Sequence, residues 1–188
     1  MLTETAPPTF TPSQSDELAR HMRLPSGFGT DHGAEIEDAW RAAVAHLEAK
    51  IGVCLAPRSF VWRGRLDPYG STEAGIAPVR AIVSAATLDD EGASTPVDAA
   101  LLSFDRGAFR TRFCAPTLAG DEVEIVFEAG FGDDWSASPA SLRRAVFLVA
   151  AHFFDMRHAA GDRTVETPFG VEALIRPWTP LRLTPRAS

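Results

Sequence analysis

Two cysteines, Cys54 and Cys114, are the side chains of this sequence best suited to covalent chemistry. A cysteine thiolate activated by a nearby histidine is a nucleophile for hydrolysis or group transfer. Each of these cysteines has apolar neighbours along the chain, and a thiol in such surroundings is normally inert packing. A small soluble cysteine-dependent enzyme therefore stays as an alternative hypothesis, and we assign no catalytic residue.

The histidines and glycines do not form a recognisable metal or cofactor site. The five histidines are His21, His32, His46, His152 and His158. The last two would lie about 120° apart on one helix, and no cysteine or carboxylate completes a ligand set with them. Gly27-Phe28-Gly29 lacks the third glycine and the preceding strand of a dinucleotide-binding loop, and no P-loop or nucleophile-elbow motif is present. We therefore expect neither a metal ion nor a cofactor.

Acidic side chains gather in two places. Asp133 and Asp134 precede a predicted helix, where carboxylates typically interact with the positive end of the helix dipole. Glu122, Glu124 and Glu128 share one face of a predicted strand, which is typical of a solvated sheet face. Neither pattern predicts catalysis.

The composition sets the broad class of the protein. The 188 residues include 45% hydrophobic residues and carry a formal net charge of −7. This length predicts one domain with its own core, and the negative charge argues against a general nucleic-acid-binding surface. The first residues do not resemble a signal peptide, so we expect free thiols in a reducing cytoplasm. The longest apolar run, 145–151, is too short to cross a bilayer, and we expect no membrane contact.

The N-terminal quarter predicts an arm followed by two helices. Residues 1–10 have no periodicity and read as a flexible arm. Within 11–56, a short helix is predicted over about 12–23 and a longer one over about 31–51. The longer helix is strongly amphipathic, with large apolar residues spaced by three or four positions. These residues are Ile36, Trp40, Val44, Leu47 and Ile51.

The region 57–130 changes to a period of two, which predicts four or five short strands. Asp105-Arg106-Gly107 is a turn signal, and it predicts a hairpin between the strands on either side of it. The clearest strand is 122–129, in which Val123, Ile125 and Phe127 alternate with acidic residues. This alternation predicts a half-buried antiparallel strand.

A long helix is predicted over 138–161, with Ser138 as its N-cap and Gly161 just beyond its end. Two apolar stripes run along it, so more than one partner must cover it. The stripes consist of Leu142, Val146, Val149, Phe153 and Met156, and of Phe147, Ala150 and Phe154. The remaining segment, 164–188, holds a short predicted helix over 169–176 among several prolines. Large apolar residues on such a segment indicate docking onto another surface.

These elements predict an α+β fold. We expect a single domain, 1–188, made of a small helical bundle with an inserted antiparallel β-rich region. Two long helices and short N- and C-terminal helices would form the bundle. From the residues alone, this arrangement favours a non-enzymatic protein whose ends contact partners.

Two stretches carry a resemblance to a known family. The stretch from Phe127 to Asp134 reads FEAGFGDD, and the stretch from Thr167 to Trp178 reads TPFGVEALIRPW. Together with Leu55-x-Pro57-Arg58 after the amphipathic helix, they resemble head–tail connector (adaptor) proteins of long-tailed double-stranded DNA phages, prophages and gene transfer agents. The similarity extends over nearly the whole chain.

The resemblance implies a virion structural protein, assembled in the bacterial cytoplasm, that forms a ring of about twelve copies beneath the portal protein. DNA would pass through the ring without sequence-specific binding. A stopper or tail-completion protein would be its next partner, and a stopper or tail-completion role in the same particle is the alternative within this family. The implied portal-docking residues are Phe169, Val171, Leu174, Ile175, Trp178 and Leu181. Packing between ring subunits is expected at Phe147, Phe154 and Arg157.

Overall fold

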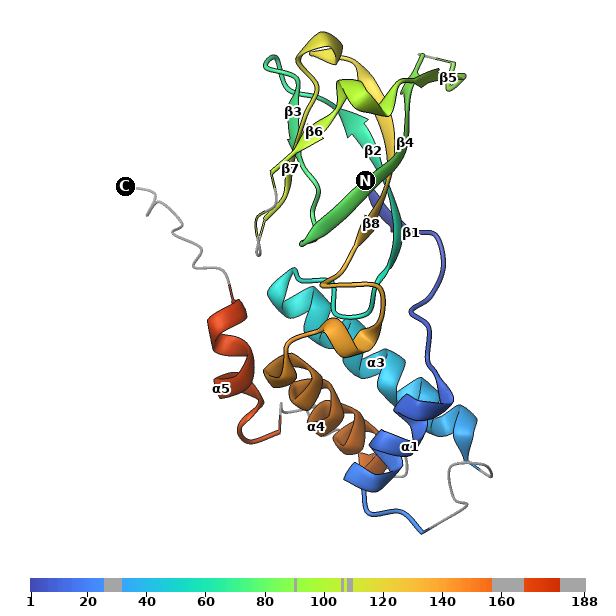
Figure 1. The fold of residues 1–188 in the computed structure, drawn as a ribbon, viewed down its shortest axis with the longest axis vertical. Helices are drawn as coiled ribbons and strands as arrows, with labels where there is room; N and C mark the ends of the chain where they lie inside the picture. The colour runs from blue at the N-terminus through green and yellow to red at the C-terminus, as the bar shows by residue number, and fades with distance from the viewer. Residues whose placement is uncertain (26–31, 90, 106, 108–109, 157–167, 180–188) are drawn as a thin grey trace.

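The computed structural model describes residues 1–25, 32–89, 91–105, 107, 110–156 and 168–179. Figure 1 shows an elongated molecule with helices at one end and strands at the other. We call these the helical half and the sheet half. The helical half contains α1 (Pro12–His21), α3 (Gly33–Ile51), α4 (Ala140–Met156) and α5 (Val171–Ile175).

The helical half is built around contact between α3 and α4. The apolar stripe of α3 is buried as predicted, and Trp40 at its centre is fully buried. The ring of Trp40 lies against the rings of Phe10 and Trp135, at centroid distances of 5.1 and 5.4 Å. Gly52 ends α3 in the left-handed conformation, with φ at 70°, which a residue without Cβ adopts readily. The four helices contribute to one hydrophobic cluster.

The sheet half holds two antiparallel sheets with a second hydrophobic cluster between them. The larger sheet has the order β1-β2-β8-β4-β5, and the smaller has the order β3-β7-β6. Phe127 of the larger sheet meets Phe113 of the smaller one at a centroid distance of 5.1 Å. The strands are β1 (Leu2–Glu4), β2 (Arg58–Arg65), β3 (Ser71–Glu73), β4 (Val79–Leu88), β5 (Ser94–Val97), β6 (Ser103–Phe104), β7 (Arg112–Cys114) and β8 (Glu122–Ala129).

The α+β class is confirmed, but the sheet part is larger than the predicted insertion. Seven strands of the described chain, β2 to β8, lie where four or five were predicted. The prediction of an arm without structure over 1–10 is also wrong, because β1 pairs antiparallel with β2. Strands of two to four residues, such as β1 and β6, are too short to show a period of two, so only their partners define them.

Two stronger predictions hold in the sheet half. Strand β8 spans Glu122–Ala129 and alternates between buried and more exposed residues. It lies between β2 and β4 and pairs with both along its length. The predicted hairpin is present as the β6–β7 pair, in which Phe104 lies opposite Phe113. Arg106, in the predicted turn, lies outside the described residues.

The start of α4 differs from the prediction. The helix begins at Ala140, two residues beyond the predicted N-cap Ser138, which lies at the end of the short 3-10 helix Trp135–Ala137. Ser138 is buried and its hydroxyl donates a hydrogen bond to the carbonyl oxygen of Leu55 at 2.5 Å. The helix start is thereby attached to the turn that follows α3. The predicted end of the helix, beyond Met156, lies outside the described residues. Among the described helices, none combines the length and apolar character needed to cross a bilayer.

Candidate interaction surfaces and the joint between the halves

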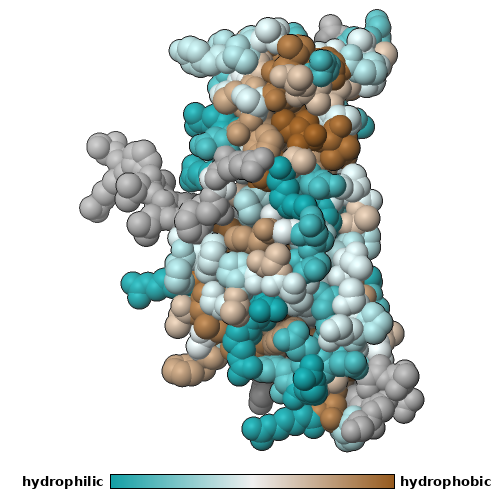
Figure 2. Space-filling model, viewed as in Figure 1, coloured by the Kyte–Doolittle hydropathy of each residue, from teal (hydrophilic) through white to brown (hydrophobic). Residues whose placement is uncertain are grey.

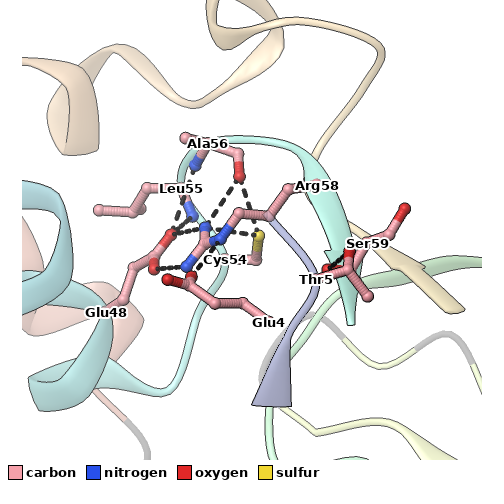
Figure 3. Close-up of polar contacts among 8 residues, drawn as sticks. All are labelled: Glu4, Thr5, Glu48, Cys54, Leu55, Ala56, Arg58 and Ser59. Carbon is pink, nitrogen blue, oxygen red and sulfur yellow. Dashed lines mark hydrogen bonds and ion pairs between the residues drawn. The ribbon is translucent and has the colours of Figure 1, made fainter. Parts of the chain in front are cut away.

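A buried ion pair joins the helical half to the sheet half. Arg58 is the first residue of β2, and Glu48 lies in the last turns of α3. Two guanidinium nitrogens of Arg58 donate to the two carboxylate oxygens of Glu48, at 3.0 and 2.7 Å. The side chains are only 10% and 6% exposed, and they face each other in Figure 3.

The backbone and a third element complete this cluster. Glu48 accepts hydrogen bonds from the backbone N–H groups of Leu55 at 2.7 Å and Ala56 at 3.4 Å. Arg58 donates to the carbonyl oxygen of Ala56 at 3.0 Å, and its Nε donates to Glu4 of β1 at 2.8 Å. We call Glu4, Glu48 and Arg58, with the turn at 55–56, the joint.

The charges of the joint are stabilised within the subunit. Burial disfavours the charged guanidinium, but the hydrogen bonds and charge of Glu48 outweigh burial and raise the pKa of Arg58 above its ordinary value. Each polar group of the pair therefore has a partner, and bidentate Arg–carboxylate geometry fixes direction as well as distance. The joint thus sets how β2 leaves the end of α3.

The joint also lowers the reactivity of the Cys54 thiol. Its side chain is fully buried, and burial followed by the charge of Glu48 raises the pKa of the thiol well above its ordinary value. A thiol that stays protonated is a poor nucleophile, so the structure disfavours the alternative of a Cys54-dependent enzyme. Cys114 is half-buried in β7 and is not disulfide-bonded. Among the described residues, no three His, Cys, Asp or Glu side chains form a group that would hold a metal ion.

The acidic residues before α4 have structural partners. Asp134 accepts hydrogen bonds from the backbone N–H and the hydroxyl of Ser136, at 2.7 and 2.6 Å, and so caps the short 3-10 helix η3 (Trp135–Ala137). These bonds, the one from the hydroxyl first, hold the pKa of Asp134 below its ordinary value. Asp133 forms an ion pair with Arg80 of β4. Both carboxylates thus have structural partners, but Asp134 caps η3 in place of the predicted long helix, and Asp133 pairs with a strand residue.

The C-terminal segment divides into buried and exposed residues. The side chains of Val171 and Ile175 are 0% exposed, because α5 packs on α4 and joins the helical cluster. Glu172 of the same helix forms an ion pair with Lys50 of α3. The prediction that Val171 and Ile175 form a docking surface is therefore wrong for this conformation, since their side chains already fill the subunit's own core.

Other predicted docking residues keep exposed surface. Phe169, just before α5, is 104% exposed and is the most exposed large hydrophobic residue of the described chain. Leu174 and Trp178 are half-buried. The indole N–H of Trp178 donates to the hydroxyl of Ser141 at 3.2 Å, and its ring meets that of Phe131 at 5.4 Å. Leu181 lies outside the described residues.

The predicted contacts between ring subunits do not fit the burial of α4. Phe147 and Phe154 are each 5% exposed and belong to the subunit's helical cluster. The ring of Phe147 is covered by Trp135 and by His21 of α1, at centroid distances of 6.3 and 5.8 Å. Phe147 is therefore covered by η3 and α1 of the same subunit, and Ala150 and Phe154 are buried in the same hydrophobic cluster. Arg157 lies outside the described residues.

Sequence reasoning missed two features of the structure. The joint was missed because Glu48 borders the apolar stripe of α3, where a charge usually faces water. Its position four residues after buried Val44 was a weak signal for burial. Tyr69 was also missed, although it is the single tyrosine of the chain and is 84% exposed. Figure 2 shows further hydrophobic surface over the sheet half. Val83 of β4 and Leu101, which also belong to this half, are exposed large hydrophobic residues.

Known proteins were compared with the sequence and the structure. Neither the protein-family models nor the curated proteins searched gave a match. Among solved structures, a chain of "Neck of empty GTA particle computed with C6 symmetry", where GTA is a gene transfer agent, is 32% identical with a TM-score of 0.79. A chain of "Virion of native gene transfer agent (GTA) particle" is 34% identical with a TM-score of 0.76. A chain of "Neck of native GTA particle computed with C12 symmetry" is 32% identical with a TM-score of 0.72. Each match covers 98% of both chains.

These matches agree with the two sequence stretches that resemble connector proteins. The stretch 127–134 forms the end of β8 and the crossing to η3, and the stretch 167–178 contains α5. The matched chains are more than 30% identical to this one, and each match extends over 98% of both chains. The chain therefore belongs to the head–tail connector (adaptor) family of phage-like particles.

Proposed function

We propose that this chain is the structural head–tail adaptor of a phage-like particle and forms a ring beneath the portal protein. The observation that supports this most is the similarity, over 98% of both chains, to proteins in gene transfer agent necks. Those necks were computed with sixfold and twelvefold symmetry, which favours a ring of about twelve copies. In such a ring each subunit contacts one neighbour through each of two different surfaces.

The charge of the chain fits a ring through which DNA moves. A duplex carries one negative charge per about 1.7 Å, and clustered Lys and Arg side chains would hold it in place. A subunit with net charge −7 avoids such retention. We therefore propose that the ring lines the DNA channel without sequence-specific contacts, and that it assembles in the bacterial cytoplasm. Its partners would be the portal on one side and a stopper or tail-completion protein on the other.

The portal contact is proposed at the exposed side of the C-terminal segment. Phe169 offers a whole aromatic side chain to a partner, and Leu174 and Trp178 are half-buried in the same segment. Aromatic side chains that enter a partner's pocket commonly carry much of an interface's binding energy. Val171 and Ile175 would hold α5 on the subunit while Phe169 reaches the portal.

Native mass measurement tests this proposal. Purified portal rings mixed with the 20.3 kDa chain should gain the mass of about twelve copies, whereas the chain and a major capsid protein should not associate. Portal rings whose mass is unchanged by an excess of the chain would contradict the proposed role.

Phe169→Ser should weaken portal binding by about thirtyfold, which corresponds to about 2 kcal/mol for a lost aromatic anchor. Its melting temperature should stay the same, because Phe169 makes no buried contact. Titration of portal rings with each variant measures the effect. Leu101→Ser, at an exposed apolar residue of the sheet half, is the matched control and should bind like the natural chain. Equal binding by the natural chain and Phe169→Ser would place the portal contact elsewhere.

A further inference from the structure

Among the described residues of the sheet half, Tyr69 is the most exposed aromatic one, at 84%. It lies in the loop between β2 and β3, at residues 66–70. Figure 1 places this loop, together with the 3-10 helix η2 (Pro116–Leu118), at the end of the molecule farthest from the helices. We call loop 66–70 and residues 115–121 the tip.

The loop that carries Tyr69 is held in one conformation by Asp67. One carboxylate oxygen of Asp67 accepts hydrogen bonds from the backbone N–H groups of Tyr69 and Ser71, at 2.8 and 2.7 Å. The other accepts from the hydroxyl of Ser71 at 2.6 Å. These bonds, led by the one from the hydroxyl, hold the pKa of Asp67 below its ordinary value, so the carboxylate stays charged at neutral pH.

Gly70 fixes the loop against the neighbouring segment. It has φ at 72°, and its carbonyl oxygen accepts a hydrogen bond from the backbone N–H of Ala115 at 2.7 Å. A Cβ at this position would lie 2.4 Å from the carbonyl oxygen of Ala115, so only glycine fits. Leu66 also donates to the backbone of Asp121 at 2.9 Å. The tip is therefore ordered before any partner arrives.

This arrangement has the properties of a protein contact. A large apolar ring exposed to water gains free energy when a pocket covers it, and tyrosine is enriched among residues that dominate interfaces. A loop that is already ordered loses little conformational entropy on binding. Nothing in the subunit's own fold needs the ring, since Tyr69 lies outside both hydrophobic clusters.

The charges around the tip select the class of partner. Both charged residues of the tip, Asp67 and Asp121, are acidic. The strands at its base carry balanced charges, since Arg65 lies opposite Glu122, and Glu73 lies opposite Arg112 and forms an ion pair with Arg110. The charges in excess at the tip are therefore negative. Such a surface repels a phosphate backbone and attracts a basic protein surface.

From these observations we infer that the tip docks a protein on the tail side of the ring, whose surface offers an apolar pocket for Tyr69 with a basic rim. The inference rests on the proposed function, in which the helical half contacts the portal through Phe169. The tip lies at the opposite end of the subunit in Figure 1, where the second partner of an adaptor must bind.

The test replaces the natural chain by variants in cells that produce the particle. Tyr69→Ala should leave this chain in purified heads, as quantified by mass spectrometry, and should lower the fraction of tailed particles in electron micrographs at least tenfold. Tyr69→Phe keeps the ring and should form tailed particles normally. Val83→Ala removes another exposed apolar side chain of the sheet half and is the matched control. Because Tyr69 is exposed, the purified Tyr69→Ala chain should melt at the same temperature as the natural chain.

Each other outcome separates this inference from the proposed function. Normal tailing with Tyr69→Ala would overturn the role of the tip and leave the adaptor role untouched. Loss of the Tyr69→Ala chain from heads would place the tip against the portal or a neighbouring copy, which also overturns the inference. If the natural chain itself were absent from purified heads, the proposed function would fail. Because that measurement uses the natural chain, it is independent of how the Tyr69→Ala variant behaves.

Discussion

Arg58→Met should lower the free energy of unfolding by about 3–5 kcal/mol, because it leaves the Glu48 carboxylate buried without its charge partner. Arg58 also donates to Glu4 and to the carbonyl oxygen of Ala56, so the substitution detaches β1 and the 55–56 turn from the joint. Urea unfolding of the purified chain, followed by tryptophan fluorescence, measures the change. Met retains most of the apolar stem of Arg, so a cavity contributes little to the loss.

The matched control is Arg63→Met on the same strand. Arg63 also pairs with a glutamate, Glu124, but its side chain is 64% exposed. Exposed pairs contribute less than about 1 kcal/mol, so this variant should be nearly as stable as the natural chain. Replacing Glu48 by Met together with Arg58 should recover only part of the loss, because the N–H groups of Leu55 and Ala56 then lack their acceptor. Equal stability of Arg58→Met and Arg63→Met would show that the joint is not a structural determinant.

Phe147→Ala should destabilise the isolated chain by about 3–5 kcal/mol, the usual cost of removing a buried phenyl ring from a core. Its ring is 5% exposed and lies against Trp135 and α1, so little of the cavity would be filled by water. Thermal unfolding of the monomer measures this effect. The loss of stability should appear in the isolated chain, without portal or other copies of the subunit, because the ring of Phe147 packs within one subunit.

Phe169→Ala is the control for Phe147→Ala, because it removes the same side chain from a fully exposed site. Its free energy of unfolding should differ from that of the natural chain by less than about 0.5 kcal/mol. A Phe147→Ala monomer of natural stability that no longer forms rings would instead restore the interpretation of this residue as a contact between subunits.

The sequence predicted those elements that carry their own periodicity. The stripe from Ile36 to Ile51 and the alternation from Val123 to Phe127 each span enough residues to define a buried face. Strand β1 has three residues, and its existence depends on pairing with β2, which lies more than fifty residues away. The residues of 1–10 by themselves carry no signal of this distant pairing, so the sequence predicted an arm with no regular secondary structure there.

The helical wheel of α4 identified most of its buried residues but not what covers them, and it included Phe153 and Met156, which are only half-buried. Two apolar stripes showed that the helix needs several partners, and a neighbouring subunit was one of the possible covers. The structure supplies η3 and α1 for Phe147, and α5 supplies Val171 and Ile175 to the same cluster. The pattern of apolar residues on one helix predicts how much of its surface is buried. It does not predict which other element buries that surface, because this depends on the rest of the fold.

The FEAGFGDD stretch could point to the family because its residues have strict geometric roles. Gly130 has φ at 131°, and a Cβ there would lie 2.9 Å from the Cα of Pro57. A Cβ at Gly132 would lie 2.4 Å from that of Ala137. Asp134 then caps η3. The stretch therefore allows β8 to cross closely past the turn after α3 and to enter α4, so it marks the fold and not a reaction. The joint has no such local signature, because Glu48 and Arg58 meet only once the turn between them has formed.

Deletion of this chain from a particle-producing strain tests the adaptor role most directly. The measurement is the fraction of heads that carry tails, counted in electron micrographs of purified particles, with the natural chain supplied in trans as the control. We expect heads with portal but without attached tails, together with free tails, and recovery of tailed particles when the chain is restored. Tailed particles at the natural frequency in the deletion strain would contradict the adaptor role.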